Sequence, residues 1–139
     1  MGSSQMNWRL AKSLIVLREQ VNDLHPRRSK VSDGSIGDYR HSTLKSDHNP
    51  DDEGVVHAID LTHDPEHLDG TAFAEALRLG RDQRLKYVIW SGRIFSSLVR
   101  PWQWRPYHGT NRHEHHVHIS VVDGELADDA SPWAILIYR

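Results

Sequence analysis

Eleven of the 139 residues are histidines, and four of these lie between His113 and His118. Imidazole side chains bind metal ions and exchange protons near neutral pH, so this concentration indicates chemistry. Polar and hydrophobic residues alternate strictly over residues 116–121, as in a half-buried strand. The alternation places His116, His118 and Ser120 on one face and valine and isoleucine side chains on the other. We therefore expect a strand with one face in the core and a second face that carries imidazoles.

A single aspartate stands inside a second hydrophobic stretch. Residues 55–62 are mostly β-branched and apolar, which predicts a buried strand, and Asp60 lies within it. A buried carboxylate is unfavourable unless a cation or a hydrogen-bond donor meets it. Hydrolytic metal sites use three nitrogen or oxygen ligands and leave a fourth position for water. Asp60 and His118 supply two such ligands, and the third should come from the loop before residue 55.

Two histidines near Asp60 compete for the third position. His48 lies upstream within Ser46-Asp47-His48-Asn49-Pro50, whereas His57 lies closer to Asp60 in the chain. Positions 57 and 60 differ by an odd number, so in a regular strand their side chains project from opposite faces. His57 could bind the same metal only if the strand broke, and we therefore favour His48. Isolated histidines are expected to be ordinary hydrogen-bonding residues: His25, His67 and His108.

Composition narrows the possible functions. The chain has no cysteine, which excludes disulfides, thiol catalysis and zinc sites built on thiolates. Lys and Arg number 17 against 19 Asp and Glu, a net charge of −2, and the basic residues form no block. This balance argues against a protein that binds nucleic acid or an anionic membrane. No apolar run is long enough to span a membrane, and no signal-peptide pattern is present.

The pattern of elements predicts one small α+β domain. Met1 to Ser4 resemble a cloning remnant, and residues 5–139 are expected to form the domain. Its sheet should be mainly antiparallel, with two to three helices. The expected elements are a helix at 7–24, a loop at 27–52, a strand at 55–62, a helix at 71–81, a hairpin of 87–90 and 93–96, an irregular segment at 98–110 and a strand at 116–121. Ser131-Pro132 fits the start of a short final helix, although 133–138 suits an edge strand equally well.

Two longer blocks of sequence contain the candidate ligands together with their neighbours. The first comprises Ser32-Asp33-Gly34-Ser35-Ile36-Gly37-Asp38, His41, Ser46-Asp47-His48-Asn49-Pro50, Gly54-Val55-Val56 and Ala58-x-Asp60-x-Thr62-His63-Asp64-Pro65. The second comprises Trp102-x-Trp104-Arg105-x-Tyr107-x-Gly109-x-Asn111-x-His113-x-x-His116-x-His118-x-Ser120. Together these blocks resemble the peptidase domains of actinobacteriophage endolysins. The wider relatives are zinc D-alanyl-D-alanine carboxypeptidases and dipeptidases, penicillin-insensitive murein endopeptidases and the hedgehog signalling domain.

The resemblance implies a zinc peptidase that cleaves peptide bonds in the stems or cross-links of bacterial peptidoglycan. It implies one zinc ion per chain, bound by His48, Asp60 and His118. In the endopeptidase branch the His-x-x-His-x-His pattern places His113 and His116 beside the metal, where either would move a proton. The dipeptidase branch has a glutamate three residues before its last ligand as base. Here His115 occupies that position and Glu114 precedes it, which makes Glu114 the second choice for the base.

Other residues are candidates for substrate contacts. Arg93 and Arg105 could stabilise an oxyanion or pair with a carboxylate of the stem peptide, because a guanidinium group binds carboxylates at two points. Three aromatic residues of the irregular segment could line a substrate groove: Trp102, Trp104 and Tyr107. We expect a monomer that is made in the host cytoplasm without a signal peptide and acts on the cell wall.

Two alternatives remain open at this stage. The chain could be a non-catalytic zinc-holding domain that binds the cell wall, as the hedgehog relative shows. It could also be an HNH-type nuclease, because Asp47-His48-Asn49-Pro50 resembles the start of that motif. The nuclease motif requires a later Asn and His in a short ββα-metal unit, and nothing after Asp51 supplies them.

Overall fold

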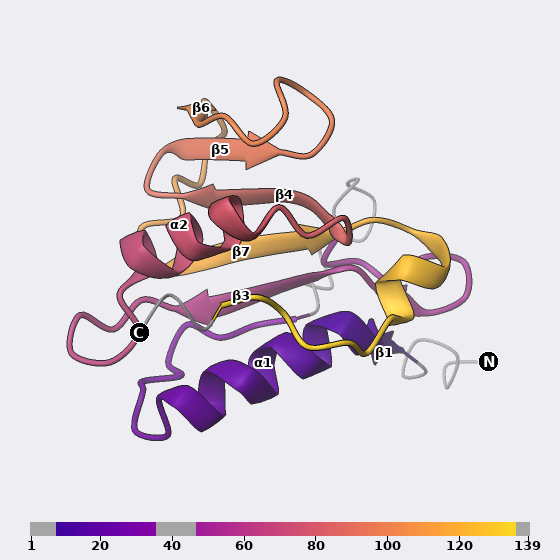
Figure 1. Ribbon diagram of the computed structural model, residues 1–139, viewed down its shortest axis with the longest axis horizontal. Coiled ribbons are helices and arrows are strands. Elements are labelled where there is room, and N and C mark those ends of the chain that lie inside the picture. Colours follow the sequence, from indigo (N-terminus) through magenta and orange to yellow (C-terminus); the bar gives the residue numbers. More distant parts are fainter. Residues whose placement is uncertain (1–7, 36–46, 136–139) are drawn as a thin grey trace.

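A five-stranded antiparallel sheet organises the protein (Figure 1). The structure is a computed structural model that describes residues 8–35 and 47–135. The sheet has the order β3-β7-β4-β5-β6, and its strands are β3 (Ala58–Thr62), β4 (Leu85–Trp90), β5 (Arg93–Ser96), β6 (Arg105–Pro106) and β7 (His116–Val121). A separate parallel pair joins β1 (Arg9–Leu10) to β2 (Val55–Val56). The helices are α1 (Lys12–Leu24), α2 (Gly70–Gly80) and the 3-10 helix η3 (Gly124–Asp128). The predicted α+β class is confirmed.

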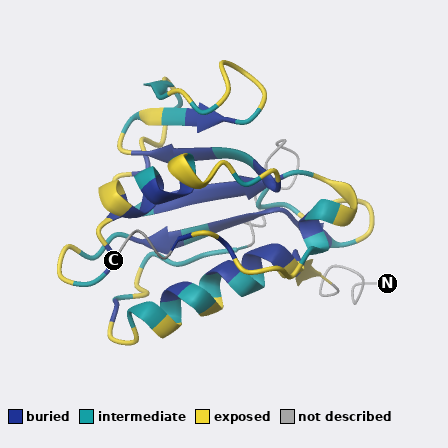
Figure 2. Cartoon of the chain, viewed as in Figure 1, coloured by how far each residue is buried: buried dark blue, intermediate teal, exposed yellow. Residues whose placement is uncertain are grey.

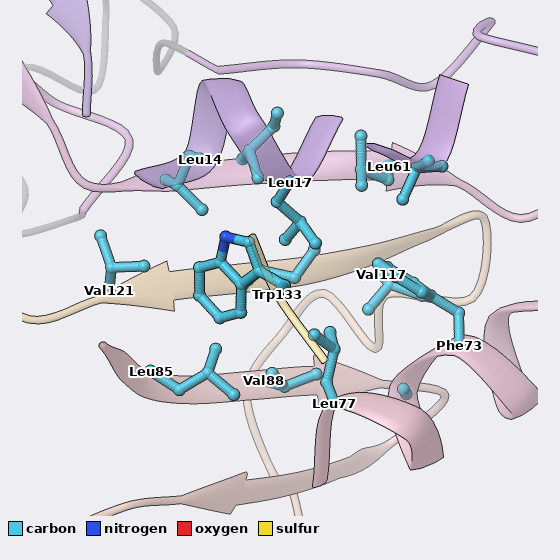
Figure 3. Close-up of a cluster of buried hydrophobic side chains, with 14 of the residues drawn as sticks. Leu14, Leu17, Leu61, Phe73, Leu77, Leu85, Val88, Val117, Val121 and Trp133 are labelled. Carbon is cyan, nitrogen blue, oxygen red and sulfur yellow. The ribbon is translucent and has the colours of Figure 1, made fainter. Parts of the chain in front are cut away.

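Both α-helices cover the same face of the sheet, and the core lies between them and the strands. α1 packs along β3, and α2 lies across β4 and β7 (Figures 1 and 3). The hydrophobic residues of β7 point into this layer because they alternate with its polar residues. Fully buried members of the core include Leu14, Leu17, Leu61, Phe73, Phe95 and Ile119. The central strands are buried, whereas the outer sides of both helices are exposed (Figure 2).

Local sequence signals explain where α2 and the hairpin begin and end. The Asp69 side chain accepts a hydrogen bond from the Thr71 backbone N–H and caps α2. Ser91 and Gly92 join β4 to β5 with φ values of +50° and +76°. Two consecutive positive φ angles are typical of the tight turn that matches the twist of a two-residue hairpin. The predicted hairpin is therefore confirmed.

Two expectations about the amino-terminal half need correction. The first helix begins at Lys12 instead of residue 7, because Arg9 and Leu10 pair with β2 as a strand. The strand expected over 55–62 is divided at His57 into β2 and β3. The backbone of His57 donates to the carbonyl of Asp47 and accepts from the N–H of Val121, so this residue connects the two segments to other parts of the chain.

The carboxyl-terminal part also differs from the expectation. Residues 131–135 form neither the helix nor the edge strand that the sequence suggested, and η3 lies upstream of them. Side chains from elsewhere satisfy the backbone instead: Arg84 donates to the carbonyl of Ser131, and Gln20 accepts from the N–H of Trp133. Trp133 itself is buried against the core. Residues 136–139 lie outside the described part of the chain.

Among the described residues, no helix is both long enough and apolar enough to cross a lipid bilayer.

Candidate metal centre

The face of the sheet opposite the helices carries the polar cluster. In the register between β3 and β7, Asp60 pairs with His118 and Thr62 pairs with His116. Directly paired residues of antiparallel strands point to the same face, so Asp60, His116 and His118 project together. Their neighbours along each strand belong to the core on the other face. The alternation predicted for residues 116–121 therefore separates the core from the site.

Three side chains of this cluster bring one ligand atom each to a common point. His48 Nε2 lies 3.2 Å from Asp60 Oδ1 and 3.1 Å from His118 Nδ1, and the last two atoms are 3.2 Å apart. In a tetrahedral site with bonds of about 2.0–2.1 Å, ligand atoms are separated by about 3.3 Å. His48, Asp60 and His118 are thus positioned to bind a metal ion.

Hydrogen bonds on the outer sides of the two imidazoles favour metal binding. The carbonyl of Ser35 lies 3.3 Å from His48 Nδ1, and the hydroxyl of Ser120 lies 2.8 Å from His118 Nε2. If each of these nitrogens donates its hydrogen to that oxygen, the inner nitrogens carry lone pairs. Two lone pairs and a carboxylate oxygen then converge within 3.2 Å.

Hydrogen bonds alone cannot satisfy the triangle formed by His48 Nε2, Asp60 Oδ1 and His118 Nδ1. Two N–H groups that both donated to Asp60 Oδ1 would repel each other at 3.1 Å, and a nitrogen without hydrogen would face the carboxylate with its lone pair. One side of the triangle is unfavourable in every tautomer, whereas a cation at its centre attracts all three atoms. The residues present therefore fit a metal ion of the size of zinc.

The charge of Asp60 dominates the electrostatics of the cluster. Burial alone would raise the pKa of Asp60, but hydrogen bonds from His118 and His48 hold it far below the ordinary aspartate value. Burial would likewise lower the pKa of His48, yet the hydrogen bond and charge of Asp60 raise it above the ordinary histidine value. Asp60 is therefore ionised at neutral pH, and a proton on His48 competes with a metal ion.

The loop that carries His48 is fixed by its neighbour Asp47. Lys86 Nζ on β4 lies 3.1 Å from Asp47 Oδ2, and the Asp47 carbonyl accepts from the N–H of His57. These contacts hold the loop beside the sheet, so that His48 reaches Asp60. His57 itself lies elsewhere, with Nε2 at 3.7 Å from carboxylate oxygens of Asp51 and Asp123. The preference for His48 over His57 agrees with this geometry, although the strand does break.

A second segment supports Asp60 from the other side. Gly34 and Asp60 exchange backbone hydrogen bonds of 3.1 and 2.7 Å, which extends the sheet beyond β3. The Asp33 carboxylate accepts from the N–H and the hydroxyl of Thr62 and forms an ion pair with the buried Arg28. This network also places the carbonyl of Ser35 against His48. The rest of that motif, residues 36–38 and His41, lies outside the described residues.

Tyr87 was not singled out from the sequence. Its ring stacks on His118 with the ring centres 5.4 Å apart, and burial raises its pKa to about 12, so the hydroxyl stays protonated. Because Tyr87 pairs with Ser120 in the register of β4 and β7, its position beside His118 follows from strand pairing. No local pattern in the sequence predicts that pairing.

His113 and His116 lie next to the three ligands. His116 Nε2 is 3.4 Å from Asp60 Oδ2, and the ring of His113 lies 5.2 Å from those of His116 and His118. Burial, with the charge of His118, lowers the pKa of His113 to about 4, and burial also lowers the pKa of His116. Both imidazoles are therefore neutral at pH 7, as a proton acceptor must be.

Two of the predicted catalytic residues lie away from this cluster. Glu114 is exposed, and its carboxylate lies 3.3 Å from Arg112 Nε. Arg93 projects from the opposite face of the sheet, where its guanidinium covers the ring of Trp104 at 4.6 Å. Position in the strand explains the second case: Ile94 pairs with Ile89, which shares the face of His118, so the adjacent Arg93 points the other way.

The aromatic candidates divide between the two faces. Trp102 and Trp104 pack against Phe95 in the core, and Trp104 Nε1 donates to Glu75 of α2. They therefore do not line a groove at the metal site. Tyr107 lies near it, with its ring 6.0 Å from that of His113.

Arg105 lies on the same face as the histidines. It pairs with Ile94, which places it on the face of His118 at the far edge of the sheet. Its Nε is buried and has no hydrogen-bond partner, and its guanidinium forms no ion pair with the described residues. Arg105 therefore remains available to an acidic ligand.

Comparisons with protein-family models, curated protein sequences and solved structures gave no match.

Proposed function

We propose that this protein is a zinc metallopeptidase that cleaves peptide bonds of bacterial peptidoglycan. The observation that carries the proposal is the triangle of His48 Nε2, Asp60 Oδ1 and His118 Nδ1, with sides of 3.1–3.2 Å. Three nitrogen and oxygen ligands are typical of catalytic zinc sites, whereas structural sites use four protein ligands. When bound, zinc supplies Lewis acidity, which acidifies water and polarises a carbonyl group.

The proton transfers of peptide hydrolysis are assigned to His113 or His116. A neutral imidazole accepts a proton from the attacking water and later donates it to the leaving amine nitrogen. The carboxylate of Asp60 lies 3.4 Å from His116 Nε2 and stabilises the imidazolium that forms there. The low pKa of His113 keeps its ring unprotonated before the reaction. The exposed Glu114, paired with Arg112, is the weaker candidate.

The choice of peptidoglycan as substrate comes from the resemblance of the two sequence blocks to endolysin peptidases. Arg105 supports it, because its guanidinium forms no ion pair with the described residues and suits the carboxylates of stem peptides. Tyr107, beside His113, is positioned to contact the same substrate. Replacement of Arg105 by Gln is expected to raise KM more than it lowers kcat.

Hydrolysis of purified peptidoglycan tests the proposal. Release of soluble peptides should stop when a chelator removes zinc, return when zinc is restored and be absent in His118→Ala. Mass spectrometry of the products identifies the cleaved bond. Binding to peptidoglycan without any zinc-dependent release would overturn the proposal in favour of a non-catalytic cell-wall domain.

Single replacements identify the base. His113→Ala and His116→Ala are each expected to keep one zinc ion, and the variant that lacks the base should lose turnover by about 10²- to 10⁴-fold. Glu114→Gln is the control and should remain active. If Glu114→Gln were inactive and both histidine variants active, the assignment of the proton transfer to histidine would be wrong.

The nuclease alternative finds no support in the fold. An HNH-type unit requires a β-hairpin followed by a helix around one metal. Here β2 pairs with β1 and β3 pairs with β7, so the two strands after His48 do not form a hairpin with each other.

A further inference from the structure

Asp60 contacts histidines with both of its oxygen atoms. Oδ1 contacts His48 and His118, whereas Oδ2 lies 3.4 Å from His116 Nε2. His113, His116 and Asp60 offer one ligand atom each within 4.8 Å of one another, and so form a second set beside the first. We propose that this set is a second, weaker site for a divalent cation, and that zinc in excess of one ion per chain binds there and stops turnover.

One ring nitrogen of each histidine in the second set is buried without a hydrogen-bond partner. These atoms are His113 Nδ1 and His116 Nδ1, and neither has a partner among the described residues. A buried ring nitrogen without a partner is unfavourable, and a cation bound through His113 Nδ1 would satisfy that atom, whereas His116 faces Asp60 with Nε2. Two imidazoles and a carboxylate are a common ligand set for zinc.

The backbone holds His113 in place with unusual geometry. Its φ angle is +58°, a left-handed conformation that a residue with a β-carbon seldom adopts. The N–H of His113 donates to Asn111 Oδ1, and its carbonyl accepts from the N–H of Ser91. These two hydrogen bonds fix the loop before β7 against the β4–β5 turn. Such strain is maintained where the position of a side chain matters.

Geometry and charge both make the second site the weaker one. The first set has three ligand-atom separations of 3.1–3.2 Å, close to the roughly 3.3 Å of a tetrahedral site. In the second set His116 Nε2 lies 3.4 Å from Asp60 Oδ2, but the His113 and His116 rings are 5.2 Å apart and must adjust to bind one ion. In addition, the two sets share a single carboxylate charge, so two divalent ions on either side of Asp60 repel each other.

Inhibition is expected because His113 and His116 would be both ligands of the second cation and candidates for the catalytic base. This part of the inference rests on the proposed function, in which His113 or His116 moves the proton. A lone pair that binds a cation cannot accept a proton. Saturation of the second site is therefore expected to remove the rate enhancement that the catalytic base supplies and to lower turnover by about 10²-fold or more.

Zinc binding to the full chain tests the site without reference to catalysis. Equilibrium dialysis against rising Zn²⁺, with metal analysis, should show one tight and one weaker ion per chain. His48→Ala should remove only the tight ion, His113→Ala only the weaker ion, and Asp60→Ala both. His115→Ala, which changes an exposed neighbouring histidine, is the matched control and should retain both ions.

A measurement on the unaltered protein guards against variants that fail to fold. Loading with one and then two equivalents of Co²⁺ should change the electron paramagnetic resonance signal, because two ions that share a carboxylate couple magnetically. Saturation at a single ion in both experiments would overturn the inference. Loss of the weaker ion in His115→Ala but not in His113→Ala would do so as well.

The two proposals can fail separately. Two bound ions per chain without any hydrolysis would support the second metal site and refute the proposed peptidase activity. Hydrolysis that continues unchanged while the weaker site is saturated would support the peptidase activity and refute the proposed inhibition.

Discussion

Replacement of Ser120 by Ala should weaken zinc binding although Ser120 is not itself a ligand. Its hydroxyl lies 2.8 Å from His118 Nε2, and the residue is fully buried. When His118 Nε2–H donates to this oxygen, Nδ1 keeps the lone pair that faces Asp60 and His48. Without the hydroxyl, the hydrogen can occupy Nδ1 instead and block the metal.

The magnitude follows from the role of such supporting contacts. Loss of the hydrogen bond that orients a metal-binding histidine reduces metal affinity by about 10- to 100-fold, or about 1.4–2.7 kcal/mol. No water can replace the hydroxyl in its original geometry, because the position has no solvent access. Competition with a chromophoric zinc chelator measures this change directly.

A control variant distinguishes loss of this hydrogen bond from general damage to the sheet. Ser96→Ala removes a buried hydroxyl from the same face of the sheet, where it bonds the loop carbonyl of Val99, and should leave zinc affinity unchanged. Zinc affinity of Ser120→Ala within about twofold of the unaltered protein would refute the reasoning, since a fixed tautomer predicts a larger loss.

Three further results are expected. Zinc removal should lower Tm while a single cooperative transition persists in calorimetry, because the core lies on the other face of the sheet; a metal-free protein without a transition would contradict this. Zinc affinity should still rise with pH above 6.5, because Asp60 raises the pKa of His48 and the proton must leave first; a plateau already reached below that pH in the chelator titration would exclude it. In the metal-free protein the same shift stabilises the fold at acid pH, and that contribution disappears as the pH rises through the raised pKa. Trp104→Phe should cost about 1 kcal/mol in denaturant unfolding through its lost bond to Glu75 and leave zinc affinity unchanged; weaker zinc binding would show that the tryptophan does serve the site.

Periodicity in the sequence was sufficient for the parts of the site that lie on strands. The alternation over 116–121 predicted the face that His116 and His118 share, and the isolated Asp60 among apolar residues predicted a ligand that shares a site with His118. These conclusions hold because the side-chain direction in a strand depends only on odd and even positions. Parity also favoured His48 over His57, but the strand breaks at His57, so the premise of that argument did not hold.

Residues whose positions depend on contacts between distant segments were harder to place. Arg93 and Trp104 were expected near the substrate, yet β5 and β6 turn them toward α2, because pairing with β4 fixes which positions share the histidine face. That register depends on contacts between strands far apart in sequence. Likewise, Ser35 and Lys86 support His48 from other segments of the chain. Ser35 belongs to the first sequence block, but nothing in that block indicates its contact with His48.

The division between the two faces of the sheet explains how a small domain can hold so many polar groups. On the helix side, alternate residues of β3, β4 and β7 fill the core, and the polar cluster takes no part in that core. On the other side, partial burial of the histidines and of the charged Asp60 is unfavourable in free energy when each group stands alone. A cation bound to them together would offset this cost. Because Asp60 Oδ1 contacts His48 and His118 and Oδ2 contacts His116, that one carboxylate determines how many cations the cluster can hold. Substitution of Asp60 should therefore affect metal content more than that of any single histidine.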